Sequence, residues 1–186
     1  GHFAKSTIRN DLGLVGYYAL MTFHRPSNVD DEASLQQLVT AITDVSERLP
    51  SIFPVHPRTR NKLEDVGLLD TLQNNDKIFL IDPIGYIDFM HLQQHATIIL
   101  TDSGGIQEES TFFGVPCLTV RDNTERPITT TLGTNKLIGI DYRRIPQEVD
   151  LVLAANSVKH TVPDLWDGKA ANRISAIIND YFNNIL

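Results

Sequence analysis

Cysteine is almost absent from this chain of 186 residues, in which Cys117 stands alone. One thiol can form neither a disulfide within the chain nor a cysteine-cluster metal site, and this scarcity is typical of a reducing compartment. No segment approaches the roughly 20 apolar residues that cross a bilayer, and the first residues lack the pattern of a signal peptide. We therefore expect a cytoplasmic protein without a membrane partner.

Basic residues are outnumbered, since 16 Lys and Arg stand against 23 Asp and Glu, for a formal net charge of −7 at pH 7. The field of the whole chain repels nucleic acid, so we expect no nucleic-acid partner, and any anionic ligand must be held locally. The composition is otherwise that of a globular protein, and this length is usual for one domain. We predict a single domain over residues 1–186.

Six short apolar segments recur along the chain and are nearly continuous rather than alternating, which is typical of strands covered on both faces. They are residues 17–23, 51–55, 77–81, 97–101, 116–120 and 136–140. Residues 31–48 have the clearest helical spacing and follow Asp30 and Asp31, which are suited to capping. Further helices are expected over residues 86–95, 106–113, 125–132, 146–155 and 170–186.

This alternation of strands and helices predicts an α/β fold: a Rossmann-like open parallel sheet with helices on both faces. Ligands of such sheets bind outside the carboxyl ends of the strands. Polar residues follow the six segments at that edge, namely His24, Arg25, His56, Asp82, Asp102, Ser103, Arg121, Asp122 and Asp141. Each alone is as well explained by a turn or a cap, but together they mark this edge as the candidate site.

Residues 101–109 (TDSGGIQEE) give the sharpest local signal, because a strand runs through two glycines into a helix. Without Cβ atoms, Gly104 and Gly105 let a phosphate approach the backbone N–H groups at the helix start. Alternatively, Ser103 caps the helix and the glycines allow close packing of helix on strand. Neither a dinucleotide fingerprint nor a P-loop is matched. Glu109 lies one turn further along the same face as Gly105, where it is placed to accept hydrogen bonds from ribose hydroxyls.

A second helix start is indicated at Pro127, with Asn123 or Thr124 as its cap. Arg126 beside it is placed to make a charge-assisted contact to a diphosphate. Tyr86 and Phe89 open another helix after a strand, where an aromatic ring can stack on a base, although a core position is the commoner outcome for Phe89.

His24 and His56 each follow a strand, and because histidine titrates near neutral pH, either can contact a phosphate or transfer a proton. No cluster has metal-ligand spacing and no nucleophile elbow is present, so we expect neither metal nor serine-nucleophile chemistry.

Several motifs together resemble the carboxy-terminal half of the non-hydrolysing UDP-N-acetylglucosamine 2-epimerases. They are residues 23–28 (FHRPSN), 54–57 (PVHP), Asp82-Pro83 with Tyr86 and Phe89, 100–109 (LTDSGGIQEE) and 124–127 (TERP). The resemblance runs in order from about residue 11 to residue 143. It implies one half of a GT-B-like two-domain enzyme, the half that holds UDP, with the amino-terminal half missing from this sequence.

The resemblance also implies an activity of polysaccharide biosynthesis, the interconversion of UDP-N-acetylglucosamine and UDP-N-acetylmannosamine. The family needs no added cofactor: it eliminates UDP to give 2-acetamidoglucal and then adds UDP back. Because the essential carboxylates come from the amino-terminal half, we expect this chain to bind UDP and UDP-N-acetylhexosamine but not to turn over substrate alone. The family commonly forms homodimers.

Carried onto matching positions, the resemblance implies that Phe89 packs on uracil, Glu109 binds ribose, and Ser103 with Gly104 and Gly105 holds the diphosphate. Arg126 would add charge at the phosphates, and His24 matches a histidine implicated in catalysis. Arg25 and His56 match a region that contacts substrate or effector.

One departure concerns allosteric activation. Many members read His-Arg-Arg-Glu-Asn where this chain has His24, Arg25, Pro26, Ser27 and Asn28, and the missing Arg and Glu help hold an activating UDP-sugar in bacterial enzymes. Activation by a second UDP-sugar is therefore not expected. Three alternatives stay open: a hydrolysing 2-epimerase, a glycosyltransferase and a non-catalytic nucleotide-sugar binding module.

Overall fold

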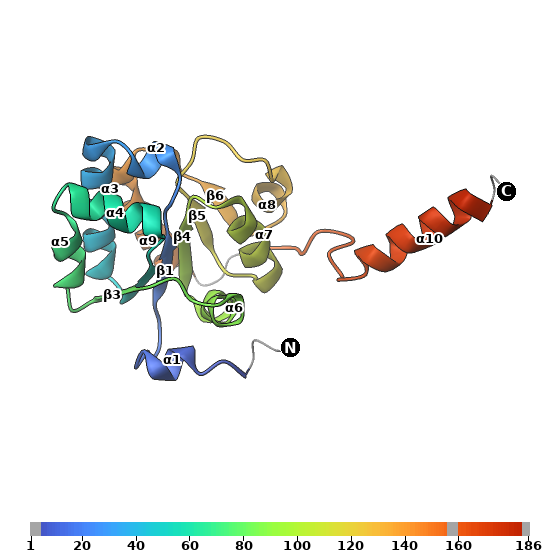
Figure 1. Ribbon diagram of the computed structural model, residues 1–186, viewed down its shortest axis with the longest axis horizontal. Coiled ribbons are helices and arrows are strands. Elements are labelled where there is room, and N and C mark those ends of the chain that lie inside the picture. The colour runs from blue at the N-terminus through green and yellow to red at the C-terminus, as the bar shows by residue number, and fades with distance from the viewer. Residues whose placement is uncertain (1–4, 156–159, 184–186) are drawn as a thin grey trace.

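The computed structural model describes residues 5–155 and 160–183. Six parallel strands form one sheet in the order β3-β2-β1-β4-β5-β6 (Figure 1). The strands are β1 (Ala19–Thr22), β2 (Ser51–Pro54), β3 (Ile78–Ile81), β4 (Ile98–Thr101), β5 (Cys117–Thr119) and β6 (Asn135–Leu137). Each of the first five apolar segments contains one strand, and the sixth, residues 136–140, overlaps β6, which begins one residue earlier. The predicted open parallel sheet is confirmed.

The predicted helices are present, α6 with the predicted ends and the others with at least one end shifted or outside the described residues. They are α3 (Glu32–Ser46), α6 (Tyr86–His95), α7 (Gly104–Phe113), α8 (Pro127–Thr131), α9 (Ile145–Ala154) and α10 (Ala170–Asn183). Asp31 caps α3 as expected, because its side chain accepts a hydrogen bond from the Ser34 amide. Residues 184–186 of the last expected helix lie outside the described residues.

Further short helices were missed from the sequence. They are α1 (Ile8–Asp11), α2 (Pro26–Val29), α4 (Pro57–Asp65), α5 (Leu69–Gln73) and a 3₁₀ turn at Tyr142–Arg144. Each of them has too few apolar residues to show a helical period. A usable signal was present for α2 and α4, because Pro26 and Pro57 occupy the first helical position, where proline is favoured.

Apolar side chains fill both faces of the sheet. On one face, Met21 and Leu100 of the strands pack with Leu38 of α3 and Val149 of α9. On the other face, Leu20 and Ile99 pack with Leu92 of α6 and Ile106 of α7. Alternate residues of one strand thus enter opposite cores, which explains why the strand segments read as continuous apolar runs.

The register of β1 and β4 decides which polar residues meet. Thr22 pairs with Thr101, and their hydroxyl oxygens lie 2.7 Å apart. Because both strands end at this level of the sheet, the residues that follow them, including His24 and Asp102, are brought side by side.

Helix α10 extends away from the rest of the chain (Figure 1). None of its described residues is buried, and its exposed apolar side chains are Ile174, Ile177, Ile178, Tyr181 and Phe182.

Across the described ranges, no helix combines the length and apolar character that membrane crossing requires.

Candidate functional site

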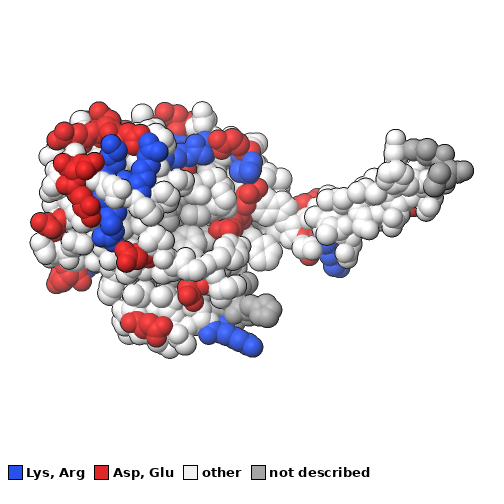
Figure 2. Space-filling model, in the orientation of Figure 1, with Lys and Arg blue, Asp and Glu red and all other residues white. Residues whose placement is uncertain are grey.

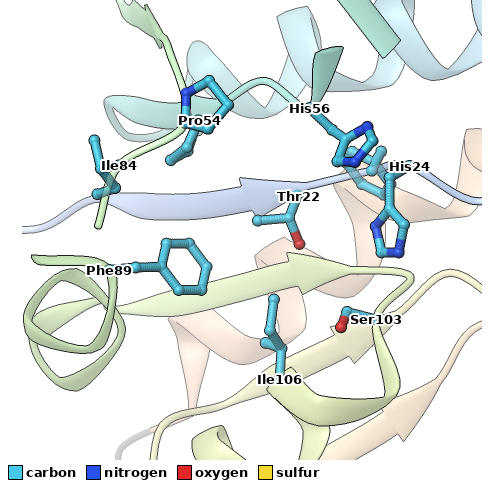
Figure 3. Close-up of a pocket in the computed structure, with 10 residues that line it drawn as sticks. Thr22, His24, Pro54, His56, Ile84, Phe89, Ser103 and Ile106 are labelled. Carbon is cyan, nitrogen blue, oxygen red and sulfur yellow. The ribbon is translucent and has the colours of Figure 1, made fainter. Parts of the chain in front are cut away.

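A pocket of ≈ 220 Å³ opens at the carboxyl edge of the sheet (Figure 3). Figure 3 shows His24 and His56 together on one side of it and Phe89 on the opposite side. The lining residues are Thr22, Phe23, His24, Pro54, His56, Pro83, Ile84, Phe89, Ser103 and Ile106. Four of the residues predicted from the sequence, His24, His56, Phe89 and Ser103, therefore share one pocket.

His24 is fixed by a carboxylate that sequence reasoning did not single out. Its Nδ1 lies 3.0 Å from Oδ1 of Asp102, and the His24 side chain is 41% exposed while that of Asp102 is 0% exposed. The same carboxylate accepts hydrogen bonds from the backbone amides of His24 and Arg25 and from Nδ2 of Asn28. The sequence showed Asp102 only as one polar residue after a strand, because its partners are more than 70 positions away.

Asp102 is charged despite its burial. Burial raises the pKa of Asp102, but the hydrogen bonds from His24, Asn28 and Arg25 outweigh it, so this pKa lies below its ordinary value. A buried anion thus lies directly behind His24, on the side away from the pocket.

The amino end of α7 offers free space above its two glycines. The helix begins at Gly104, two residues before the predicted start, so both glycines lie in its first turn. Among the atoms of the described residues, a Cβ added at Gly105 would meet none within 4 Å, and one added at Gly104 would meet only Oε2 of Glu125, at 3.9 Å. The packing alternative is therefore wrong, because the chain itself needs glycine at neither position.

Ser103 occupies the cap position of α7, but its side chain makes no capping hydrogen bond within the described chain. The capping role considered for this hydroxyl is thus not what the structure shows. The backbone amide of Ser103 instead donates to the hydroxyl of Thr101, at 3.0 Å. Ser103 lines the pocket beside the N–H groups of the first helical turn.

Gln107, which sequence reasoning did not assign, ties the turn before α8 to α7. Its Nε2 donates to the Ser103 carbonyl, and its Oε1 accepts from the Thr124 hydroxyl at 2.6 Å and from Nδ2 of Asn135 at 3.1 Å. The predicted caps of α8 are wrong, because Arg126 occupies the cap position, and the hydroxyl of Thr124, two residues earlier, accepts from the Arg126 amide.

Arg126 lies next to α7, where its Nε is 2.9 Å from Oε1 of Glu108. Both side chains are nearly half exposed, so this ion pair is weak and can be exchanged for a ligand. Arg126 does not line the 220 Å³ pocket.

Glu109 faces a neighbouring hollow of ≈ 320 Å³, lined also by Met90, Glu108, Phe112 and Trp166. Its Oε2 accepts from Nε2 of the buried Gln93 at 2.6 Å, and its Oε1 lies 3.5 Å from the Tyr86 hydroxyl. An acidic side chain is attracted to the positive end of a helix dipole only within the first turn. The first turn of α7 holds no acidic residue, so this attraction explains neither Glu108 nor Glu109.

Arg25 and His56 differ in placement. His56 lines the pocket with its ring centroid 5.6 Å from that of His24, while its Nδ1 accepts from the Arg58 amide at the start of α4. Arg25 points elsewhere: its Nε donates to the Asp102 carbonyl and a terminal nitrogen lies 3.8 Å from Glu125.

Buried Arg121 binds the carboxylate of Glu125 through both terminal nitrogens. This hydrogen bonding, with the nearby charges of Arg121 and Arg25, lowers the pKa of Glu125 to about 2.

The described residues contain no group of three or more His, Cys, Asp or Glu that is arranged to hold a metal ion.

Comparisons with known proteins agree with the geometry. The profile of the UDP-N-acetylglucosamine 2-epimerase family matches residues 2–179. A UDP-N-acetylglucosamine 2-epimerase of Methanocaldococcus jannaschii is 40% identical over 163 residues, 87% of this chain and 44% of the relative. A UDP-2,3-diacetamido-2,3-dideoxy-D-glucuronate 2-epimerase of Pseudomonas aeruginosa is 37% identical over 163 residues, 85% of this chain and 43% of the relative.

Among solved structures, the Methanocaldococcus jannaschii UDP-GlcNAc 2-epimerase in complex with UDP-GlcNAc and UDP superposes with a TM-score of 0.82 at 37% identity. The match covers 95% of this chain and 49% of that one. The chain therefore spans about half the length of the relatives that it matches.

Proposed function

Because this chain belongs to the UDP-N-acetylglucosamine 2-epimerase family, we propose that it holds the UDP part of a UDP-N-acetylhexosamine at the carboxyl edge of its sheet. Residues 1–186 act as one UDP-binding domain of a longer enzyme. The observation that carries this proposal is the free space over Gly104 and Gly105 at the amino end of a ten-residue helix, beside the pocket of His24 and Ser103.

The diphosphate would lie against the first turn of α7, where unpaired N–H groups and the positive end of the helix dipole favour an anion. Ser103 adds a hydroxyl there, and Arg126 adds a guanidinium once it leaves Glu108. Uracil would pack on Phe89, which lines the pocket opposite His24. Glu109, held by Gln93, would accept hydrogen bonds from the ribose hydroxyls.

The reaction of the longer enzyme would be 2-epimerisation of the UDP-sugar. A base takes the C2 proton and the bond from C1 to UDP breaks, which leaves a double bond between C1 and C2. UDP then adds back at C1 while a proton is delivered to the opposite face of C2, so the configuration at C2 is inverted. Negative charge grows on the departing diphosphate, so the α7 end and Arg126 would stabilise the transition state more than the ground state. His24 is placed to exchange a proton with the bound ligand at the pocket.

The remaining part of the enzyme is a partner that this function requires. The described residues bring no carboxylate into the pocket to serve as the base. The exposed apolar face of α10 fits packing against that remaining part, since apolar side chains in such a row usually meet a partner.

A second candidate differs in the sugar. The similarity to the Pseudomonas aeruginosa relative favours a diacetamido-glucuronate as the alternative group on UDP. The residues proposed here to bind the ligand contact uracil, ribose and the diphosphate, so they favour neither sugar.

The test of the site is calorimetry with UDP on the chain and on Gly105→Ala, Ser103→Ala and Glu109→Ala. We expect Gly105→Ala to weaken binding about tenfold or more, because a methyl group would keep the phosphate from its charge-assisted hydrogen bonds. The same substitution should leave folding intact or stabilise it by about 0.5–1 kcal/mol, since alanine is the better helix former. Glu64→Ala, which changes an exposed side chain of α4, is the matched control.

If all three variants bind UDP as the unmodified chain does, the site is misplaced. We also expect the 186-residue chain to show no epimerisation of UDP-N-acetylglucosamine when the products are separated by chromatography. Turnover by the chain alone would contradict the requirement for a second part.

A further inference from the structure

We propose that Asp102 is a positioning residue that holds the proton of neutral His24 on Nδ1, so that Nε2 presents its lone pair to the pocket. The consequence for the ligand rests on the proposed function, whereas the tautomer itself can be tested without any ligand. The two residues are 78 positions apart and meet only because β1 and β4 are neighbours in register.

Several N–H groups of the described chain donate to the carboxylate. Its Oδ2 accepts from the His24 amide at 3.0 Å, the Arg25 amide at 2.9 Å and Nδ2 of Asn28 at 3.0 Å. A carboxylate that receives this many N–H groups is ionised and can only accept. The 3.0 Å contact between its Oδ1 and Nδ1 of His24 therefore requires the proton on Nδ1.

A buried second layer keeps the carboxylate from turning. The Asn28 amide nitrogen also donates to the Val120 carbonyl at 3.3 Å, and its oxygen accepts from the Tyr142 hydroxyl at 3.0 Å. These contacts fix which way the Asn28 amide points. The ends of β1, β4 and β5 and the turn at Tyr142 thus all constrain one imidazole.

The chemical consequence follows from the two nitrogens of the ring. With Nδ1 protonated and bound to Asp102, Nε2 is free to accept a proton from a group in the pocket. Once protonated, the imidazolium can donate from Nε2 to a diphosphate oxygen, while the anionic Asp102 balances its charge.

Asp102→Asn should reverse the tautomer. The amide oxygen is expected to take the place of Oδ2, where three N–H donors converge, which leaves the amide nitrogen in the place of Oδ1 facing His24. That nitrogen donates to Nδ1, so the ring proton moves to Nε2. The lone pair would then no longer face the pocket.

The experiment is nitrogen-15 NMR of the chain with labelled histidine, without UDP, at about pH 8.5. The His24→Gln spectrum identifies the His24 signals among those of six histidines. We expect protonated Nδ1 in the unmodified chain and protonated Nε2 in Asp102→Asn. Tyr142→Phe, which removes one outer hydrogen bond, is the control and should keep the original tautomer.

Protonated Nε2 in the unmodified chain, or an unchanged tautomer in folded Asp102→Asn, would overturn the proposal. If Asp102→Asn does not fold, the spectrum of the unmodified chain decides alone. Loss of UDP binding in the calorimetry above would reject the proposed function without affecting this result, so the two failures are distinguishable.

Discussion

At the residue scale, the exposed groups of the candidate site depend on buried polar partners. His24 is held by Asp102, and Glu109 is held by Gln93, and both partners are 0% exposed. A buried partner removes the freedom to rotate that a surface side chain has, so the ligand-facing group is preorganised before a ligand arrives.

The depressed pKa of Asp102 predicts a specific sensitivity to acid. The pKa of Asp102 is lower in the folded than in the unfolded state. Its ionised carboxylate therefore stabilises the fold when the pH is above the ordinary pKa of aspartate, about 4. This stabilisation is lost as the pH falls through the lowered folded value.

Urea unfolding of the chain and of Asp102→Asn at pH 7 and at about pH 2.5 measures the effect. We expect the variant to be less stable by roughly 2–3 kcal/mol at pH 7, because buried N–H donors lose an ionised acceptor. The difference should shrink at the acidic pH. An equal difference at both pH values would show that the carboxylate charge contributes nothing.

At the element scale, α7 organises the site because its first turn is joined to two other segments. Gln107 links it to the turn before α8 and to β6 through Thr124 and Asn135. The predicted boundary of α7 was two residues late, since glycines usually lie outside helices, and here the glycines begin one.

Gln107→Leu should destabilise the chain by about 2–3 kcal/mol, because the part-buried Thr124 hydroxyl and the buried Asn135 amide lose their common acceptor. It should also weaken UDP binding, since the turn that carries Arg126 is released. Urea unfolding and calorimetry measure the two effects. The control is Thr130→Ala, an exposed hydroxyl that bonds only within α8, for which a change within about 0.5 kcal/mol is expected.

At the scale of the whole molecule, charge is distributed unevenly. Figure 2 shows Lys and Arg side chains gathered over α4 and toward α8, bordered by acidic side chains. Two of these bases are paired, Arg58 with Asp30 and Arg60 with Asp82. Each pairing offsets one positive charge, so the basic cluster does not form a purely positive surface in this chain of net charge −7.

Helix α10 contributes little to the stability of this chain, because none of its described residues is buried. Ile177→Ala should therefore change the free energy of unfolding by no more than about 0.5 kcal/mol. Ile42→Ala, which truncates a side chain buried in α3, should lower the free energy of unfolding by about 2–5 kcal/mol. Equal losses at both positions in urea unfolding would show that α10 packs on the sheet domain in solution.

Local sequence patterns were enough to predict the sheet, most helices and the edge that carries the candidate site, because strand and helix periodicities are local and parallel strands end on one side. They also marked His24, His56, Phe89 and Ser103, which the structure brings to one pocket. The contact of Asp102 with His24, the link from Gln107 to Thr124 and the space over Gly105, which no atom of the described residues fills, emerge only from the fold. These are contacts between residues far apart in the chain, set by strand register and packing, and no local pattern encodes them.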